Sequence, residues 1–371
     1  MLRCKPMIMK KLIKKLHLWL SLPLGIVISI TCFTGAVLIF EKEITESIQR
    51  KYYYVDSVGD QKISFADAIS AVEPLLEEDQ RITGIVVSPD ASRTWKVSLS
   101  SPKHAAVYVN QYSGEVLGSP KRLSFFSTMF RLHRWLMDTR PAEKGAIYWG
   151  KMIVGISTLA CVILLLTGVV LWIPKSVQMF KNRSKISVTR GWRRFLYDLH
   201  VAGGIYATLL VLAMALTGLT WSFEWYREGL YKIFGAEGAS QVVASKQPRS
   251  NGVTAPAAYE VAYDEVVSRY DSHGDVTITP NTISVKLGGM GNPRAADKYT
   301  YNPISGAIDS VTLYDDAPRR QKMSGWIYSL HVGNWGGMIT RILWFLAAML
   351  GATLPITGYY LWIKRSFGGK I

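Results

Sequence analysis

Four long apolar runs divide the chain: residues 18–40, 152–173, 201–223 and 342–363. Each run has 22 or 23 residues and contains no Asp, Glu, Lys or Arg. Because a helix needs about 20 apolar residues to cross the hydrocarbon core of a bilayer, the pattern predicts four transmembrane helices. The first run is longer than the apolar core of a signal peptide, so we expect it to remain in the protein as a membrane span.

The two long segments between spans follow other patterns. Amphipathic spacing predicts helices at 65–77 and 257–270. Alternating apolar and polar residues predict short strands at 81–87, 94–99, 105–110, 277–279, 283–287 and 299–306, the last ending in a turn. The stretch 235–255 is rich in Gly, Ala, Ser and Pro and is expected to be a loose linker. Each long segment is therefore predicted to form a small α+β domain.

The two halves of the chain resemble each other in order and spacing, which indicates an internal repeat. A Thr-Gly pair stands near the end of each apolar run: Thr34-Gly35, Thr167-Gly168, Thr217-Gly218 and Thr357-Gly358. His17 precedes the first pair by 17 residues, and His200 precedes the third by the same 17. Both halves cross the membrane in the same direction, so a pseudo-two-fold axis along the membrane normal should relate them.

The charge distribution orients the chain in the membrane. The formal net charge is +16, yet residues 1–17, 174–200 and 364–371 carry 16 Lys and Arg with one acid, Asp198. By the positive-inside rule, both termini and the loop 174–200 are cytoplasmic. The basic segments thus set the topology and contact the lipid bilayer, and nucleic acid is not needed to explain the charge. The 12 Trp and 19 Tyr also suit a membrane protein, and no Cys lies in either long outer segment.

The fold class expected is a membrane protein with four transmembrane helices in two parallel pseudo-repeats, plus two small extracytoplasmic α+β domains. Its predicted parts are the cytoplasmic tail and first span (1–41), the first outer domain (42–123), an outer interfacial helix and second span (124–173), a basic cytoplasmic loop (174–199), the third span (200–224), the second outer domain (225–325), and an outer interfacial segment with the fourth span and tail (326–371).

Four of the six histidines stand at repeat-matched positions beside the spans. His17 and His200 begin outward spans near the cytoplasmic face, whereas His133 and His331 precede inward spans near the outer face. The 24 residues from His17 to Glu41 would rise about 36 Å as a helix, so no single site can use all four histidines. A two-fold axis then pairs His17 with His200, and His133 with His331.

Two facing neutral imidazoles suit the two axial positions of a haem iron. Zinc usually takes three or four protein ligands, and no Cys or further His accompanies either pair. Small residues on the helix faces that follow His17 and His200 would leave room for a flat ring. Other interpretations stay open, because a histidine at a membrane boundary is often only an interfacial or hydrogen-bonded residue, and small faces or Thr-Gly pairs are often packing or kink devices.

These motifs resemble those of the PepSY-associated transmembrane proteins, also called iron-regulated membrane proteins. The matching segments are HLWLSLPLGIVISITCFTGAVLIFEKEI at 17–44, YVNQYSGEVLG at 108–118, FRLHRWLMD at 130–138, DLHVAGGIYATLLVLAMALTGLTWSFEW at 198–225, YSLHVG at 328–333, and the TG-x-x-LWI motifs at 167–173 and 357–363. The family includes inner-membrane ferric-siderophore reductases with b-type haem. The resemblance implies that His17, His133, His200 and His331 bind haem b, in two copies. The insertion GGMGNPRAAD at 288–297 departs from the family pattern.

The function hypothesis is a haem-containing oxidoreductase of the cytoplasmic (inner) membrane that passes electrons outward to reduce ferric siderophores in the periplasm. Its electron donor would be a quinol or a cytoplasmic reductase. The candidate substrate surface comprises Arg134, Trp135, Trp326 and Trp335, for which the alternative is an aromatic belt with an arginine at the lipid headgroups. The alternative function is a membrane-anchored PepSY-type binding or regulatory module without redox activity. A permease is disfavoured because the spans have no charged residue at mid-membrane.

Overall fold

A computed structural model describes the chain except for residues 1–4, 103, 144, 237–255 and 368–371. The predicted linker 235–255 therefore lies almost wholly outside the described residues. The chain divides into two compact units, each of which is described by itself. The first unit comprises Met1–Glu41, Leu123–Leu230 and Leu330–Ile371, and the second comprises Lys42–Arg122 and Tyr231–Ser329.

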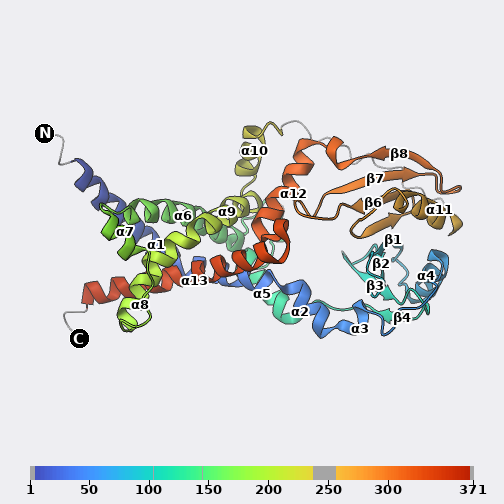
Figure 1. Cartoon of the computed structure of the whole chain (residues 1–371), viewed down its shortest axis with the longest axis horizontal. Helices are drawn as coiled ribbons and strands as arrows, with labels where there is room; N and C mark the ends of the chain where they lie inside the picture. The colour runs from blue at the N-terminus through green and yellow to red at the C-terminus, as the bar shows by residue number, and fades with distance from the viewer. Residues whose placement is uncertain (1–4, 103, 144, 237–255, 368–371) are drawn as a thin grey trace. The chain divides into compact units, whose positions relative to one another are not determined.

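Four long helices form the first unit: α1 (Lys5–Leu38), α6 (Trp149–Trp172), α9 (Gly204–Ser222) and α13 (Gly337–Phe367). All four belong to segments long and apolar enough to cross a membrane, so the predicted number of spans is confirmed. Helix α1 packs against α6 and α13, and α9 packs against the same two helices (Figure 1). Helices at equivalent places in the two halves, α1 with α9 and α6 with α13, therefore stand diagonally across the bundle.

Shorter helices lie at both ends of this bundle. At one end, α7 (Val177–Arg183) and α8 (Trp192–Asp198) lie beside the start of α1 and the end of α13 (Figure 1). This end carries the basic segments and is called the basic end below. Helix α5 (Ser124–Trp135) packs on α1 and α6 at the opposite end. A π-helical turn, η2 (Leu199–Gly203), joins α8 to α9, and a 3₁₀ turn, η5 (Asn334–Gly336), precedes α13.

Three helices contain residues of both units: α2 (Glu41–Ile48), α10 (Glu224–Ile233) and α12 (Arg319–Val332). The sequence pattern predicted none of them as a separate element within a domain. Helices α2 and α10 have only 8 and 10 residues, which is shorter than the window of about 11–18 residues in which helical periodicity is read.

The second unit is built on one antiparallel sheet of eight strands in the order β4-β3-β2-β1-β5-β6-β7-β8. The strands are β1 (Ile82–Val87), β2 (Trp95–Leu99), β3 (Ala106–Val109), β4 (Val116–Gly118), β5 (Val276–Thr279), β6 (Thr282–Lys286), β7 (Ala296–Tyr301) and β8 (Ile308–Thr312). Six of them match strands predicted from alternation. The exceptions are β4, which has only three residues, and β8, which is mostly exposed.

The single sheet differs from the expectation of two small domains. Strand β1 of the first half pairs with β5 of the second, with Ile85 opposite Ile278. Each half would otherwise leave an unpaired edge strand with free backbone donors and acceptors. The close approach requires a glycine, because a Cβ atom on Gly84 would lie 2.3 Å from the carbonyl oxygen of Ile278. The two halves thus share one sheet and one apolar core.

One face of the sheet is apolar and is covered by two helices, α4 (Phe65–Val72) and α11 (Pro256–Val267). The register carries one buried row of side chains across the seam between the halves: Val107, Val97, Ile85, Ile278, Ile283 and Tyr299. Helix α4 begins with a capping box in which Ser64 and Asp67 bond reciprocally. Short turns of helix complete the unit: α3 (Arg50–Tyr53), η1 (Glu73–Leu75) and η4 (Tyr314–Asp316).

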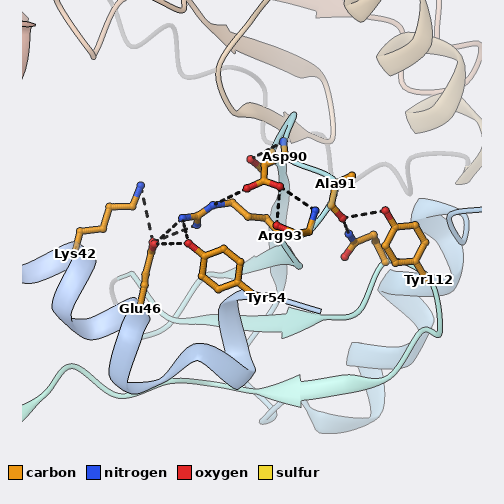
Figure 2. Close-up of polar contacts among 10 residues, drawn as sticks. Lys42, Glu46, Tyr54, Asp90, Ala91, Arg93 and Tyr112 are labelled. Atoms are coloured by element: carbon orange, nitrogen blue, oxygen red, sulfur yellow. Dashed lines mark hydrogen bonds and ion pairs between the residues drawn. The ribbon is translucent and has the colours of Figure 1, made fainter. Parts of the chain in front are cut away.

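A charged network holds α2 and the segment after α3 against the sheet (Figure 2). The Arg93 guanidinium donates to both carboxylate oxygens of Glu46, at 3.2 and 2.5 Å, and to the Tyr54 hydroxyl at 2.8 Å. Asp90 and Lys42 extend the network at its two ends. The Arg93–Glu46 pair is bidentate and largely shielded from solvent, and such charge-assisted pairs are stronger than hydrogen bonds between neutral groups.

Asp275, the residue before β5, lies within electrostatic reach of this network. Burial acts to raise the pKa of its carboxyl group, but a hydrogen bond from Lys286 at 2.9 Å, with the charges of Lys286, Lys42 and Arg93, outweighs burial and lowers the pKa. The carboxylate therefore stabilises the folded second unit at neutral pH.

Candidate functional site: two histidine pairs

Within the first unit, the four repeat-matched histidines come together as two pairs. The imidazole centroids of His17 and His200 are 6.5 Å apart at the basic end, and the ring planes are nearly perpendicular, at 89°. The centroids of His133 and His331 are 6.0 Å apart at the opposite end, with planes at 56°. These are called the basic-end pair and the opposite-end pair below. The structure thus brings together the partners that the sequence repeat indicated.

Each imidazole is held through its Nδ1 atom by a helix from another part of the bundle. At the basic-end pair, His17 lies 2.8 Å from Thr167 Oγ1, and His200 lies 3.0 Å from both the Leu354 carbonyl and Thr357 Oγ1. At the opposite-end pair, His133 lies 2.9 Å from the Thr31 carbonyl. His331 lies 2.9 Å from the Met214 carbonyl and 3.2 Å from Thr217 Oγ1. His17 also has a backbone hydrogen bond at Leu164. In every case the backbone partner lies three residues before the threonine of a Thr-Gly pair.

These contacts fix the tautomer of each ring. A carbonyl oxygen can only accept, so the Nδ1 atoms of His133, His200 and His331 must carry the proton. The hydroxyl of Thr167 donates to the Ile163 carbonyl at 2.8 Å, so its oxygen is left to accept from His17. A neutral ring protonated on Nδ1 presents its Nε2 lone pair, which is the form that binds a metal.

The glycine of each Thr-Gly pair lies against a histidine ring, and at three of the four glycines a Cβ atom would crowd that ring. A Cβ atom placed on Gly35 would lie 2.9 Å from His133 Cε1, and one on Gly218 would lie 3.2 Å from His331 Cε1. The corresponding distances are 3.3 Å for Gly358 with His200 and 3.6 Å for Gly168 with His17. The Thr-Gly repeat is therefore a cradle for imidazoles. The sequence carried this signal, but spacing alone could not separate it from a packing or kink device.

His200 lies in the π-helical turn η2, a local feature that sequence reasoning missed. Such turns are rare and often occur at functional sites. Just before it, Asp198 is buried, and its carboxylate accepts from Arg194 Nε at 2.9 Å and from the Ser187 amide at 3.2 Å. The only acid of the basic segments is thus used to tie the loop 174–200 to the start of the span that carries His200.

The two pairs are far apart along the bundle. Gly35, which contacts His133, follows His17 by 18 residues on α1, a rise of about 27 Å. The core between the pairs is apolar and includes Ile28, Cys161, Leu165, Ala207, Val211 and Ala347. Among the described residues, no group of three or more His, Cys, Asp or Glu side chains comes together. Each candidate site therefore offers two protein ligands and not a three- or four-ligand cluster.

The sequence of the chain matches the PepSY-associated TM region over residues 14–365. The chain belongs to this family. The match includes all four spans and all four paired histidines, and it makes the protein a multi-pass membrane protein of the PepSY-associated type. No curated protein matches the chain.

In this PepSY-associated protein, three of the four residues proposed for a substrate surface belong to the first unit. Arg134 and Trp135 end α5 beside His133, and Trp135 contacts Tyr148 with ring centroids 5.9 Å apart. Trp335, in η5, contacts Trp344 at the same centroid distance of 5.9 Å. Trp326 falls in the second unit.

Each histidine pair of this family member could hold one metal ion between its two rings. Two metal–imidazole bonds of about 2 Å, each continued by about 1 Å to the ring centre, would separate the two centroids by roughly 6 Å. The observed centroid distances are 6.5 and 6.0 Å. Buried polar atoms without a partner also occur around the opposite-end pair: Thr31 Oγ1, Asn334 Oδ1 and Trp335 Nε1. A planar metal chelate with polar edges matches both features.

Proposed function

We propose that the protein is a haem-containing oxidoreductase that moves electrons across the cytoplasmic membrane to reduce ferric siderophores. His17 and His200 would bind one haem b, and His133 and His331 a second. Membership of the PepSY-associated family supports the membrane setting of this proposal.

A single observation carries the proposal: two histidine pairs at opposite ends of one bundle, with every Nδ1 atom engaged by a fixed acceptor. Interfacial histidines would not need a matched Nδ1 acceptor at all four positions or a glycine against each ring. Hydrogen bonds at the Nδ1 atom of a metal-binding imidazole orient the ring and raise its basicity.

The residues of the chain have separate roles in this proposal. A bound haem would supply a reversible one-electron couple at its iron. The imidazoles would hold the iron through Nε2, and the threonines with their neighbouring carbonyls would hold the imidazoles through Nδ1. The apolar core between the pairs excludes water and ions from the space that the electron must cross.

The basic end is proposed to face the cytoplasm, as the positive-inside rule requires. A quinol or a cytoplasmic reductase would give up electrons there, and a quinol would release two electrons and two protons. Each ferric siderophore would accept one electron at the other side. Reduction assists release because Fe(II) is a softer ion than Fe(III) and is held more weakly by hard oxygen ligands. Trp135 and Trp335 remain candidates for the surface at which the ferric chelate docks.

The test uses the full-length protein in nanodiscs without oxygen. The protein is reduced chemically, mixed with a ferric hydroxamate or catecholate in a stopped-flow instrument, and followed by its visible absorption with a ferrous-specific chelator present. We expect the reduced bands to decay while one ferrous complex forms for each electron lost. His133→Ala should slow this decay more than His17→Ala, because its pair lies on the side of the acceptor.

Two results would contradict the proposal in different ways. Purified protein with no haem absorption after expression with ample haem supply would favour the membrane-anchored binding or regulatory module. Haem-containing protein whose reduced bands do not respond to any ferric chelate would retain the cofactor but exclude the siderophore as acceptor.

A further inference from the structure

A half-buried arginine stands beside the opposite-end pair. Arg134 follows His133 in α5, and its positive charge lies within electrostatic reach of both His133 and His331. Its guanidinium carbon lies 5.9 Å from the centre of the Phe130 ring, a weak cation–π contact. Among the described residues, no carboxylate forms an ion pair with it.

The nearest acid in the sequence is engaged elsewhere. Asp138 accepts from the Gly150 amide at 2.8 Å through Oδ2, at the start of α6, and from the Thr139 amide at 2.7 Å through Oδ1. Its carboxylate therefore supports the first turn of a membrane span. Arg134 therefore pairs with no acid in the part of the chain that the structure describes, and its guanidinium can bind an anion that is not part of the chain.

The surroundings indicate what kind of anion this is. Arg134 lies next to the two imidazoles that would bind one haem, and the unpartnered Trp335 Nε1 belongs to the turn that follows His331 in the chain. A haem carries two propionate carboxylates at one edge of its ring. A guanidinium binds a carboxylate through two parallel N–H donors, and an indole N–H adds a third donor.

Resting on the proposed haem at His133 and His331, we propose that Arg134 binds a propionate of that haem and raises its reduction potential. Arg134, and Trp335 through its indole N–H, are then cofactor-binding residues and not part of the substrate surface. The repeat supplies only one such arginine, because Val332 stands after His331 where Arg134 stands after His133. A lipid phosphate is the other oxyanion that could occupy this position, and the experiment separates the two.

The potential should change for an electrostatic reason. A guanidinium paired with a propionate offsets negative charge close to the iron and so favours the reduced, less positive form. When the arginine is replaced by a neutral residue, the propionate charge is uncompensated and the oxidised form is favoured. A lipid phosphate bound to Arg134 would leave both potential and haem retention almost unchanged on substitution, because the propionates would have other partners.

The experiment uses His17→Ala protein in nanodiscs, in which the remaining haem is the one at the opposite-end pair. Its midpoint potential and its rate of haem transfer to excess apomyoglobin are measured alone and with Arg134→Gln, Arg134→Lys or Arg131→Gln. Arg131 is the matched control, because it is an exposed arginine on the same helix that donates to the Met137 carbonyl.

For Arg134→Gln we expect haem transfer to be about tenfold faster. We also expect the midpoint potential of the haem to fall by about 59 mV, which corresponds to a tenfold change in a one-electron equilibrium constant. Arg134→Lys should keep most of the potential, since the charge remains, but should still lose haem faster, since the two-donor geometry is gone. If Arg134→Gln is too unstable to isolate, the rate of haem transfer from Arg134→Lys tests the inference. Arg131→Gln should match the parent in both measurements.

The results that overturn the inference are distinct from those that overturn the proposed function. If Arg134→Gln or Arg134→Lys keeps haem as firmly as Arg131→Gln with an unchanged potential, Arg134 has another partner, such as lipid phosphate, while the haem protein stands. If the parent protein carries no haem, the proposed function and this inference fall together.

Discussion

The glycines of the Thr-Gly pairs permit a comparison in which the same substitution should weaken haem binding at one site and leave it nearly unchanged at the other. In Gly35→Ala the new methyl carbon would lie 2.9 Å from His133 Cε1, whereas in Gly168→Ala it would lie 3.6 Å from His17 Cε1. Ordinary carbon contacts are about 3.5–4.0 Å, so only the first variant must displace its imidazole, by roughly 0.6–1 Å. Both variants replace a helical glycine, so their gain in helix propensity is the same.

The magnitude follows from the cost of overpacking. Forcing an extra methyl group into a packed site typically costs about 1–3 kcal/mol. His133 must be in its cradle to bind metal, because its Nδ1 bond to the Thr31 carbonyl at 2.9 Å sets the direction of Nε2. The clash in Gly35→Ala should therefore weaken haem binding at the opposite-end pair by roughly 5- to 150-fold. Gly168→Ala should leave haem binding at the basic-end pair within about threefold of the unsubstituted protein.

The assay is haem content by the pyridine haemochrome method, combined with haem transfer to apomyoglobin from protein in nanodiscs. A two-phase transfer in the unsubstituted protein would report the two sites, and only one phase should accelerate in Gly35→Ala. Equal acceleration in both glycine variants, or none in either, would refute the cradle interpretation. Gly218→Ala, with its 3.2 Å contact to His331, should fall between the two.

Three further predictions concern topology and the second unit. Reporter fusions at Ser187 should report the cytoplasm and those near Ser101 the outside, and the reverse result at either position would exclude the proposed orientation. Gly84→Ala should destabilise the eight-stranded sheet by about 2 kcal/mol or more, seen as faster limited proteolysis, whereas the exposed Gly288→Ala should not, because a Cβ there makes only an ordinary contact of 3.9 Å. Asp275 has a lowered pKa, so its stabilising contribution is present above its ordinary pKa and is lost as the pH falls through the lower folded value. Asp275→Asn should therefore make the free energy of unfolding, followed by tryptophan fluorescence, fall less steeply as the pH is lowered. The same fall with pH in the variant and the unsubstituted protein would contradict this.

The spans and most strands were predictable because their signals are local. A run such as 152–173 encodes a span by length and composition, and the alternation at 94–99 encodes a half-buried strand. The joining of the halves was not predictable in this way. Whether β1 and β5 meet depends on two edges that are nearly 200 residues apart in the chain, and the only local trace is Gly84, which looks like any strand glycine.

The histidine pairing was accessible for a different reason. Repeat-matched residues must face each other across a two-fold axis, so the order of His17 and His200 in the two halves already suggested their proximity. The partners of Nδ1 were not accessible, because they depend on which helix packs beside each ring. Thr31 and Leu354 act through backbone carbonyls, which carry no sequence signature. The π-helical turn at His200 likewise leaves no compositional mark.

The most direct test of the account is the haem-to-protein ratio across single and double histidine variants in nanodiscs. The unsubstituted protein should bind two haems, and each of His17→Ala, His200→Ala, His133→Ala and His331→Ala should retain one. The double variant His17→Ala with His200→Ala should still retain one, because both residues serve the same haem, whereas His17→Ala with His133→Ala should retain none. A ratio of zero for the within-pair double variant, or a ratio of two for all single variants, would contradict two independent haem sites built from facing histidine pairs.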